Sequence, residues 1–160
     1  KTSPLSLRAF LLIKFFIYYL PLLVLAEILI VGTNLLLKVT PFMMTLSTVT
    51  VFFLVPGIVA IGIGLGAAYP DFKAENPTQT VTSFGGLVFM ITCAAYIGLV
   101  ILLQAGPVYR IFMADLHGRP LSTAVWLWTA TAFSAAFVLS ILAVVLPLRF
   151  GLRRLSRVPI

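Results

Sequence analysis

Charged residues are scarce in this sequence. Of its 160 residues only 9% are Asp, Glu, Lys or Arg, whereas 61% are hydrophobic, and the mean hydropathy is +1.16. About a quarter of the residues of a soluble globular domain are charged. The composition therefore predicts a membrane protein and excludes a large aqueous catalytic domain within these residues.

Cysteine and histidine each occur once, as Cys93 and His117. A single cysteine excludes an internal disulfide and a multi-cysteine metal site, so we interpret Cys93 as a small buried apolar side chain. His117 lies beside Gly118 in a polar turn, which favours an exposed side chain over a ligand. We expect no metal site and no cofactor.

The phosphate-binding pattern G-x-x-x-x-G-K-[ST] is missing, so we expect no ATP hydrolysis by this chain itself. The stretch "GIGLG" does not fit the dinucleotide fingerprint G-x-G-x-x-G in spacing or in context. Gly62 and Gly66 instead form a G-x-x-x-G step, which lets two helix backbones approach closely in a membrane. We predict helix packing at these two glycines.

Long apolar runs dominate what is present. They cover residues 15–37, 42–68, 84–105 and 122–148, and a spanning helix needs about 20 apolar residues. The sequence therefore predicts an all-α polytopic membrane protein with four transmembrane helices. In the loop after the third run, apolar residues at helical spacing predict a short helix on or in the membrane surface.

A short amphipathic segment, residues 1–14, precedes the first run. Ser3 suits a helix N-cap and Pro4 the first helical position, while Ser6, Arg8 and Lys14 interrupt an apolar face. We predict an elbow helix that lies along the membrane interface before the chain turns into the bilayer.

Basic residues are unevenly distributed over the predicted loops. Eight of the eleven fall on one side of the membrane: Lys1, Arg8, Lys14, Lys73, Arg149, Arg153, Arg154 and Arg157. The positive-inside rule then places both termini and residues 70–82 in the cytoplasm. We expect the basic tail, residues 149–160, to bind anionic headgroups, which makes membrane lipids a partner and disfavours nucleic acid.

Two of the four acidic residues, Asp71 and Glu75, lie in the polar segment "AAYPDFKAENPTQ" together with Lys73. On a helix their spacing would place both carboxylates on one face, but Pro70 and Pro77 bracket the segment too closely for a long helix. Two carboxylates with a lysine make a weak metal site. We interpret the segment as a solvated loop.

A third acid, Glu27, lies inside the first apolar run. An ionised carboxylate at mid-membrane costs on the order of 3 kcal/mol, so Glu27 should not face lipid. Either it contacts a substrate or a proton, or it is protonated or hydrogen-bonded to Asn34 or to a threonine of the second run. The candidate residues of a polar path are Glu27, Asn34, Thr45, Thr48 and Thr50.

The order of these parts resembles the C-terminal part of type-2 ABC exporter permeases. In that class a cytoplasmic helix of the pattern S/T-P-[IL]-S-x-x-x-[IL]-L-x-x-K precedes the third of six spans; the matching residues here are Ser3, Pro4, Leu5, Ser6, Leu11 and Lys14. Residues 64–86 are similar to a subgroup in which G-A-x-Y/F-P-x-F-x-x-E-N-P recurs. The resemblance covers nearly all of the chain, and the missing first two spans suggest a piece of a longer protein.

The resemblance implies a permease in the plasma membrane of a bacterium or archaeon, working with a separate ABC ATPase subunit and with a second permease half or a second copy. We expect the elbow and the polar loop to dock the ATPase through Ser3, Pro4, Ser6, Arg8, Asp71, Lys73 and Glu75. The rival hypotheses are a membrane enzyme acting on lipid, with Asp71 and Glu75 at the interface, and a structural assembly subunit. The lack of a second conventional catalytic group favours transport.

Overall fold

The structure, a computed structural model, describes residues 7–69, 84–118 and 122–155, with Leu7, Arg8 and Leu155 described by their backbone alone. Within these ranges it contains helices α1 (Leu7–Leu36), α2 (Pro41–Ala68), α4 (Phe84–Leu116) and α5 (Thr123–Leu155) and no strand. All four helices are long and apolar enough to cross a membrane. The predicted all-α fold with four spans is confirmed.

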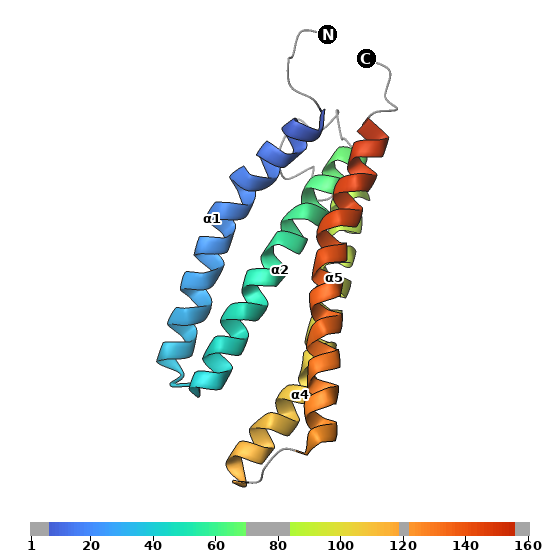
Figure 1. Cartoon of the computed structure of the whole chain (residues 1–160). Coiled ribbons are helices and arrows are strands. Elements are labelled where there is room, and N and C mark those ends of the chain that lie inside the picture. The colour runs from blue at the N-terminus through green and yellow to red at the C-terminus, as the bar shows by residue number, and fades with distance from the viewer. Residues whose placement is uncertain (1–6, 70–83, 119–121, 156–160) are drawn as a thin grey trace.

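The helices run alternately up and down, with α2 in the middle (Figure 1). Helix α2 packs most extensively on α5 and also contacts α1 and α4, whereas α1 barely touches α5. The Leu7, Ala68, Phe84 and Leu155 ends of the four helices lie together at one end of the bundle (Figure 1). We call this the basic end, because Lys14, Arg149, Arg153 and Arg154 lie in or near its last helical turns, and we call the opposite end the hairpin end.

The helices are longer than the predicted spans. Helix α1 runs without a break from Leu7, so residues 7–14 continue the first span instead of forming a separate elbow; residues 1–6 lie outside the described part. Helix α4 continues past Pro107 to Leu116, and α5 continues into the basic tail as far as Leu155. Hydropathy marks the part of a helix that lipid surrounds, whereas Arg, Lys, Leu and Met continue helical hydrogen bonding beyond it.

A tight turn joins α1 to α2 and holds them antiparallel. The hydroxyl of Thr40 accepts a hydrogen bond from the Met43 amide at 3.4 Å, and Pro41 occupies the first helical turn. This is a favourable helix start, because the proline has no amide hydrogen to leave unpaired. Lys38 adopts a left-handed conformation with φ 50°, which ends α1 within a few residues.

Small residues allow α2 to sit close to its neighbours. A Cβ atom placed on Gly64 would overlap the backbone of Pro147, and one placed on Gly57 would lie 2.6 Å from the Tyr96 hydroxyl oxygen. On α5, Gly151 faces Gly64 in the same way. The buried side chains form two clusters, one of Phe15, Val55, Val59 and Ala60 and one of Ile61, Cys93, Tyr96 and Val100.

Candidate functional site

The polar residues predicted for α1 lie on its seam with α2. Phe15, Tyr19 and Leu23, which follow one another at four-residue spacing, belong to the cluster that packs on α2. Glu27 is the next residue in this series, and residues four apart share a helix face. The carboxyl group of Glu27 is therefore directed towards the α1–α2 seam, as required of an acid that avoids lipid.

Both carboxyl oxygens of Glu27 are buried and have no hydrogen-bond partner among the described residues. Asn34 does not supply one, because its side-chain amide donates to the Ser47 hydroxyl of α2 at 2.5 Å. Ser47 in turn donates to the Met44 carbonyl at 3.0 Å. Of the alternatives left open for Glu27, the hydrogen bond with Asn34 or a threonine of α2 is therefore not the one found, and Glu27 is an unsatisfied polar group inside the bundle.

The threonines of α2 do not converge on Glu27. The Thr45 hydroxyl is exposed and donates to the Pro41 carbonyl one turn back at 3.0 Å. Thr50 faces the other way and donates to the side-chain oxygen of Gln104 on α4 at 3.1 Å. Thr48 is half-buried. The predicted polar path is therefore divided between two sides of α2.

A second polar site, which the sequence did not predict, lies between α2, α4 and α5. The Tyr96 hydroxyl lies 3.1 Å from the Ser140 hydroxyl oxygen and 3.4 Å from the Phe53 carbonyl oxygen, and Ser140 donates to Ala136 at 3.0 Å. A cavity of about 150 Å³ next to these groups is lined by the polar side chains Thr50, Gln104 and Ser140 and by apolar neighbours. No sequence signal pairs these residues, because the pairing depends on how the three helices are rotated.

Gly62 and Gly66 face away from the tight α2–α5 contact. A Cβ atom on Gly62 would lie 3.2 Å from the Phe89 ring of α4, whereas nothing lies within 4 Å of one on Gly66. The close helix approach predicted for this pair is made instead by Gly64, two residues away. Gly62 and Gly66 line an open groove of about 530 Å³ between α1, α2 and α4.

Arg8, one of the predicted docking residues, lies in the first turn of α1. The others lie outside the described residues: Ser3, Pro4, Ser6, Asp71, Lys73 and Glu75. The two ends of the segment 70–83 are described. The rings of Tyr69 and Phe84 meet edge to face with centroids 5.7 Å apart, and the guanidinium of Arg154 lies 6.0 Å from the Tyr69 ring centre. Aromatic and cation–π contacts therefore hold both ends of the segment beside the last turn of α5.

Four apolar helices with polar contacts between them define a multi-pass membrane protein, and no group of three or more His, Cys, Asp and Glu side chains comes together within its described ranges. The chain belongs to the family described as "Putative ATP-binding cassette", whose profile matches residues 1–160. No curated protein and no solved structure matches the chain. The resemblance to ABC proteins is thereby confirmed at the level of the family.

Proposed function

We propose that this chain is the membrane-spanning permease portion of an ATP-driven ABC exporter, which forms part of the substrate path and docks a separate ATPase subunit. One observation carries the proposal: an ABC-related family matches all 160 residues of a chain that has no G-x-x-x-x-G-K-[ST] motif. Without that phosphate-binding loop, these residues do not supply ATP hydrolysis by the usual apparatus, and in our proposal it comes from a separate ATPase subunit.

The environment of Glu27 supports a transport role. An ionisable residue inside a membrane bundle is a candidate for contact with a substrate or a proton. Its burial is unfavourable, and such residues are rare in spanning helices unless they have a function. Both carboxyl oxygens of Glu27 are buried and lack a hydrogen-bond donor within the described helices. In our proposal a cationic or proton-donating group of the substrate pairs with Glu27 when α1 and α2 separate.

The packing of α1 supports a second subunit. Only 6% of its most apolar stretch is buried within the chain, and Ile17, Val24 and Ile28 are 61%, 56% and 64% exposed. In our proposal a second permease half, or a second copy of this chain, lies against this face, and the substrate path runs between the two halves.

The basic end is the proposed ATPase side. The excess of Lys and Arg at this end supports a cytoplasmic location for both ends of the chain in the plasma membrane of a bacterium or archaeon. The contacts among Tyr69, Phe84 and Arg154 give the segment 70–83 fixed ends. Motion of a docked ATPase would reach α2, α4 and α5 through this anchor, since coupling travels through packed contacts.

The test is purification of the tagged chain from its native membranes in mild detergent. We expect a chain with a Walker A motif to co-purify, and ATP hydrolysis to require that partner. A stoichiometric ATPase activity of the chain alone would contradict the proposal. Recovery of the intact chain without any such partner would instead favour the lipid enzyme or the assembly subunit.

The docking surface is tested separately by the double charge reversal Asp71→Lys with Glu75→Lys. We expect the double variant to lose most of the co-purified ATPase and of the substrate-stimulated hydrolysis. Asp115→Lys is the matched control, because Asp115 is an exposed acid at the hairpin end. Equal loss in the control, or no loss in the double variant at normal expression, would show that the loop does not dock the partner.

A further inference from the structure

The groove of about 530 Å³ between α1, α2 and α4 has a volume typical of ligand sites, which are about 300–1,000 Å³. Ten of its twelve lining residues are apolar, and the polar exceptions are Lys14 and Tyr18. The groove is open to the surroundings of the bundle, since Phe10, Tyr18 and Leu22, which line it, are also exposed. This composition fits a ligand with a long apolar part and one anionic or hydrogen-bonding group.

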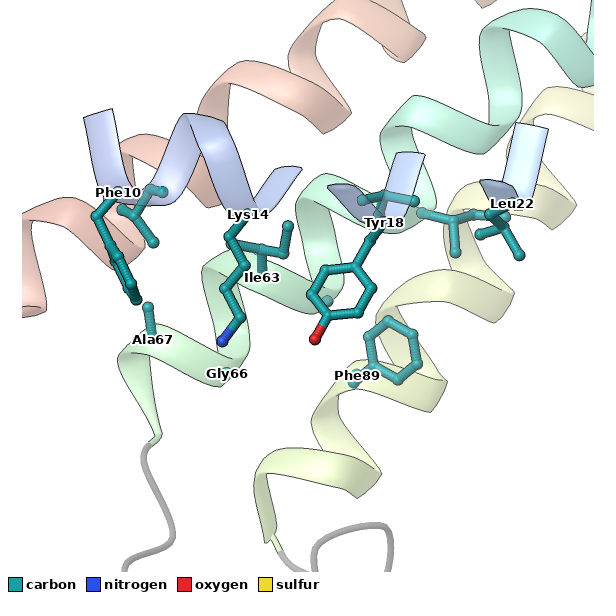
Figure 2. Close-up of a pocket in the computed structure, with 12 residues that line it drawn as sticks. Phe10, Lys14, Tyr18, Leu22, Ile63, Gly66, Ala67 and Phe89 are labelled. Carbon is teal, nitrogen blue, oxygen red and sulfur yellow. The ribbon is translucent and has the colours of Figure 1, made fainter. Parts of the chain in front are cut away.

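Helix α1 forms one wall of the groove. Phe10, Lys14, Tyr18 and Leu22 follow one another at four-residue spacing and project from α1 on the same side (Figure 2). The amino group of Lys14 reaches over Gly66, and the Tyr18 ring points towards Phe89 of α4 (Figure 2). A cation and a hydroxyl group are thus presented one turn apart along an otherwise apolar wall.

Two of the α2 residues that line the groove, Gly62 and Gly66, have no side chain. Gly62 and Gly66 are one turn apart on α2, and no atom lies within 4 Å of a Cβ position on Gly66. The Phe89 ring lies against Gly62 and forms the opposite wall (Figure 2). The space beside these glycines suits a linear hydrocarbon chain, whereas a larger residue at either glycine would reduce it.

A bilayer centred on α1 would place Lys14 near the boundary between the headgroups and the hydrocarbon. Helix α1 has 30 residues and is about 45 Å long, close to the full thickness of a bilayer with its headgroups, about 40–45 Å. Lys14 lies about 10 Å from the Leu7 end by the helical rise, where the headgroups meet the hydrocarbon. Within the described residues Lys14 has no acidic partner, because Glu27 lies about 20 Å further along α1 and Asp115 lies at the hairpin end.

We propose that this groove binds one anionic phospholipid from the leaflet at the basic end, with the phosphate at the Lys14 amino group and one acyl chain over Gly62 and Gly66 beside Phe89. The Tyr18 hydroxyl, one turn deeper, donates to an ester oxygen. The charge of Lys14 selects an anionic lipid over a zwitterionic one. This site is independent of the proposed transport function, since it needs only a chain that spans a membrane.

The experiment compares variants of the full chain reconstituted in phosphatidylcholine vesicles with and without phosphatidylglycerol, followed by native mass spectrometry of the lipid that stays bound. We expect Lys14→Gln to lower retention of phosphatidylglycerol about fivefold, the factor that one basic group contributes at a membrane surface. Gly66→Leu should remove the retained lipid of either kind. Because the space at Gly66 is open, this variant should keep the helical content of the wild type.

Two matched controls accompany these variants. Lys38→Gln removes an exposed lysine at the hairpin end, and Gly98→Leu replaces a glycine of α4 that also has no atom within 4 Å of its Cβ position. We expect both controls to retain lipid as the wild type does.

Three results would overturn the proposal. Unchanged phosphatidylglycerol retention in Lys14→Gln would show that Lys14 does not bind the phosphate, for example because a carboxylate of residues 71–75 occupies it. Competition by soluble glycerol phosphate would show that the headgroup binds without the acyl groove. A change of oligomeric state in Gly66→Leu with lipid retention intact would identify the groove as a contact between helices of two chains.

Discussion

Helices α1 and α2 are alike in sequence character and opposite in environment. The most apolar stretches of the two have mean hydropathies of 2.2 and 2.3, yet 39% of that stretch is buried in α2 and only 6% in α1. Helix α2 contains four glycines, whereas α1 contains one and is rich in Phe, Tyr, Leu and Ile. Hydropathy therefore indicates that a helix crosses the membrane, and residue size indicates whether it lies at the centre of the bundle.

Helix α2 has many contacts within the chain, whereas α1 is held by few. Lipid is as apolar as a leucine side chain, so helices in a membrane associate through close packing and polar contacts instead of hydrophobic burial. Helix α2 packs closely on α5 at Gly64 and on α4 at Gly57, and it has polar contacts with α4. Helix α1 has mainly the turn at residues 37–40, one cluster around Phe15 and the Asn34–Ser47 hydrogen bond.

The largest expected effect comes from breaking the close contact of α2 with α5. In Gly64→Leu the new side chain overlaps the Pro147 backbone, and overpacking of this kind costs about 1–3 kcal/mol, occasionally more. We expect a loss near the upper end of this range, measured as a lower unfolding temperature in detergent. Gly66→Leu is the control and should change stability by less than about 0.5 kcal/mol. Equal losses would show that the two faces of α2 are packed alike.

A stabilising effect of intermediate size is expected from replacing Glu27 on α1. Glu27→Leu removes two unpaired buried oxygens, and a buried polar group without a partner costs about 1–3 kcal/mol. We expect the variant to unfold at a higher temperature, and Glu27→Gln to fall between it and the wild type. If the proposed function holds, both variants lose substrate-stimulated ATP hydrolysis by the partner. A lower unfolding temperature for Glu27→Leu would mean that the carboxyl group is satisfied in the bilayer.

The smallest expected loss of stability comes from removing the polar contact of Tyr96, which lies between α2, α4 and α5. Tyr96→Phe removes a hydroxyl group that lies 3.1 Å from the Ser140 hydroxyl oxygen. Hydrogen bonds between helices in membranes contribute about 0.6 kcal/mol on average, so a loss of this size is expected from equilibrium unfolding. Tyr109→Phe is the control, because that side chain is 59% exposed. A loss above about 1.7 kcal/mol would place Tyr96 in a larger network than the one described.

The sequence predicted the four spans because hydropathy is a local property. The start of α2 was predicted to within a residue from the apolar run alone, 42 against Pro41, and in the structure Thr40 and Pro41 form the helix start. The far ends of α4 and α5 lie up to eleven residues beyond the predicted spans, Ala105 against Leu116. The short separate helix predicted after the third span is the continuation of α4, because a helix can extend past the apolar part of its sequence. In α4 the helix continues through Pro107, whose ring is tolerated within a transmembrane helix.

The candidate site was predicted less well than the fold. Glu27 and Asn34 were identified from their polarity alone, but the partner of Asn34 is Ser47, and the partner of Thr50 is Gln104, which the sequence did not single out. Likewise Gly64, and not the pair Gly62 and Gly66, makes the close contact with α5. A rotation of α2 by a fraction of a turn would exchange these roles. That rotation is set by contacts between residues far apart in the chain.

The contact of Gly64 with Pro147 also has a consequence for how the chain is made. These residues belong to the second and the last of the described helices, separated by about 80 residues of synthesis, which at about 5–20 residues per second takes on the order of 4–16 s. During this interval the glycine face of α2 has only lipid or α4 against it. The bundle therefore closes at the end of translation of this segment, when α5 enters the membrane, and shortening the chain within α5 would leave the Gly64 face of α2 without its partner helix.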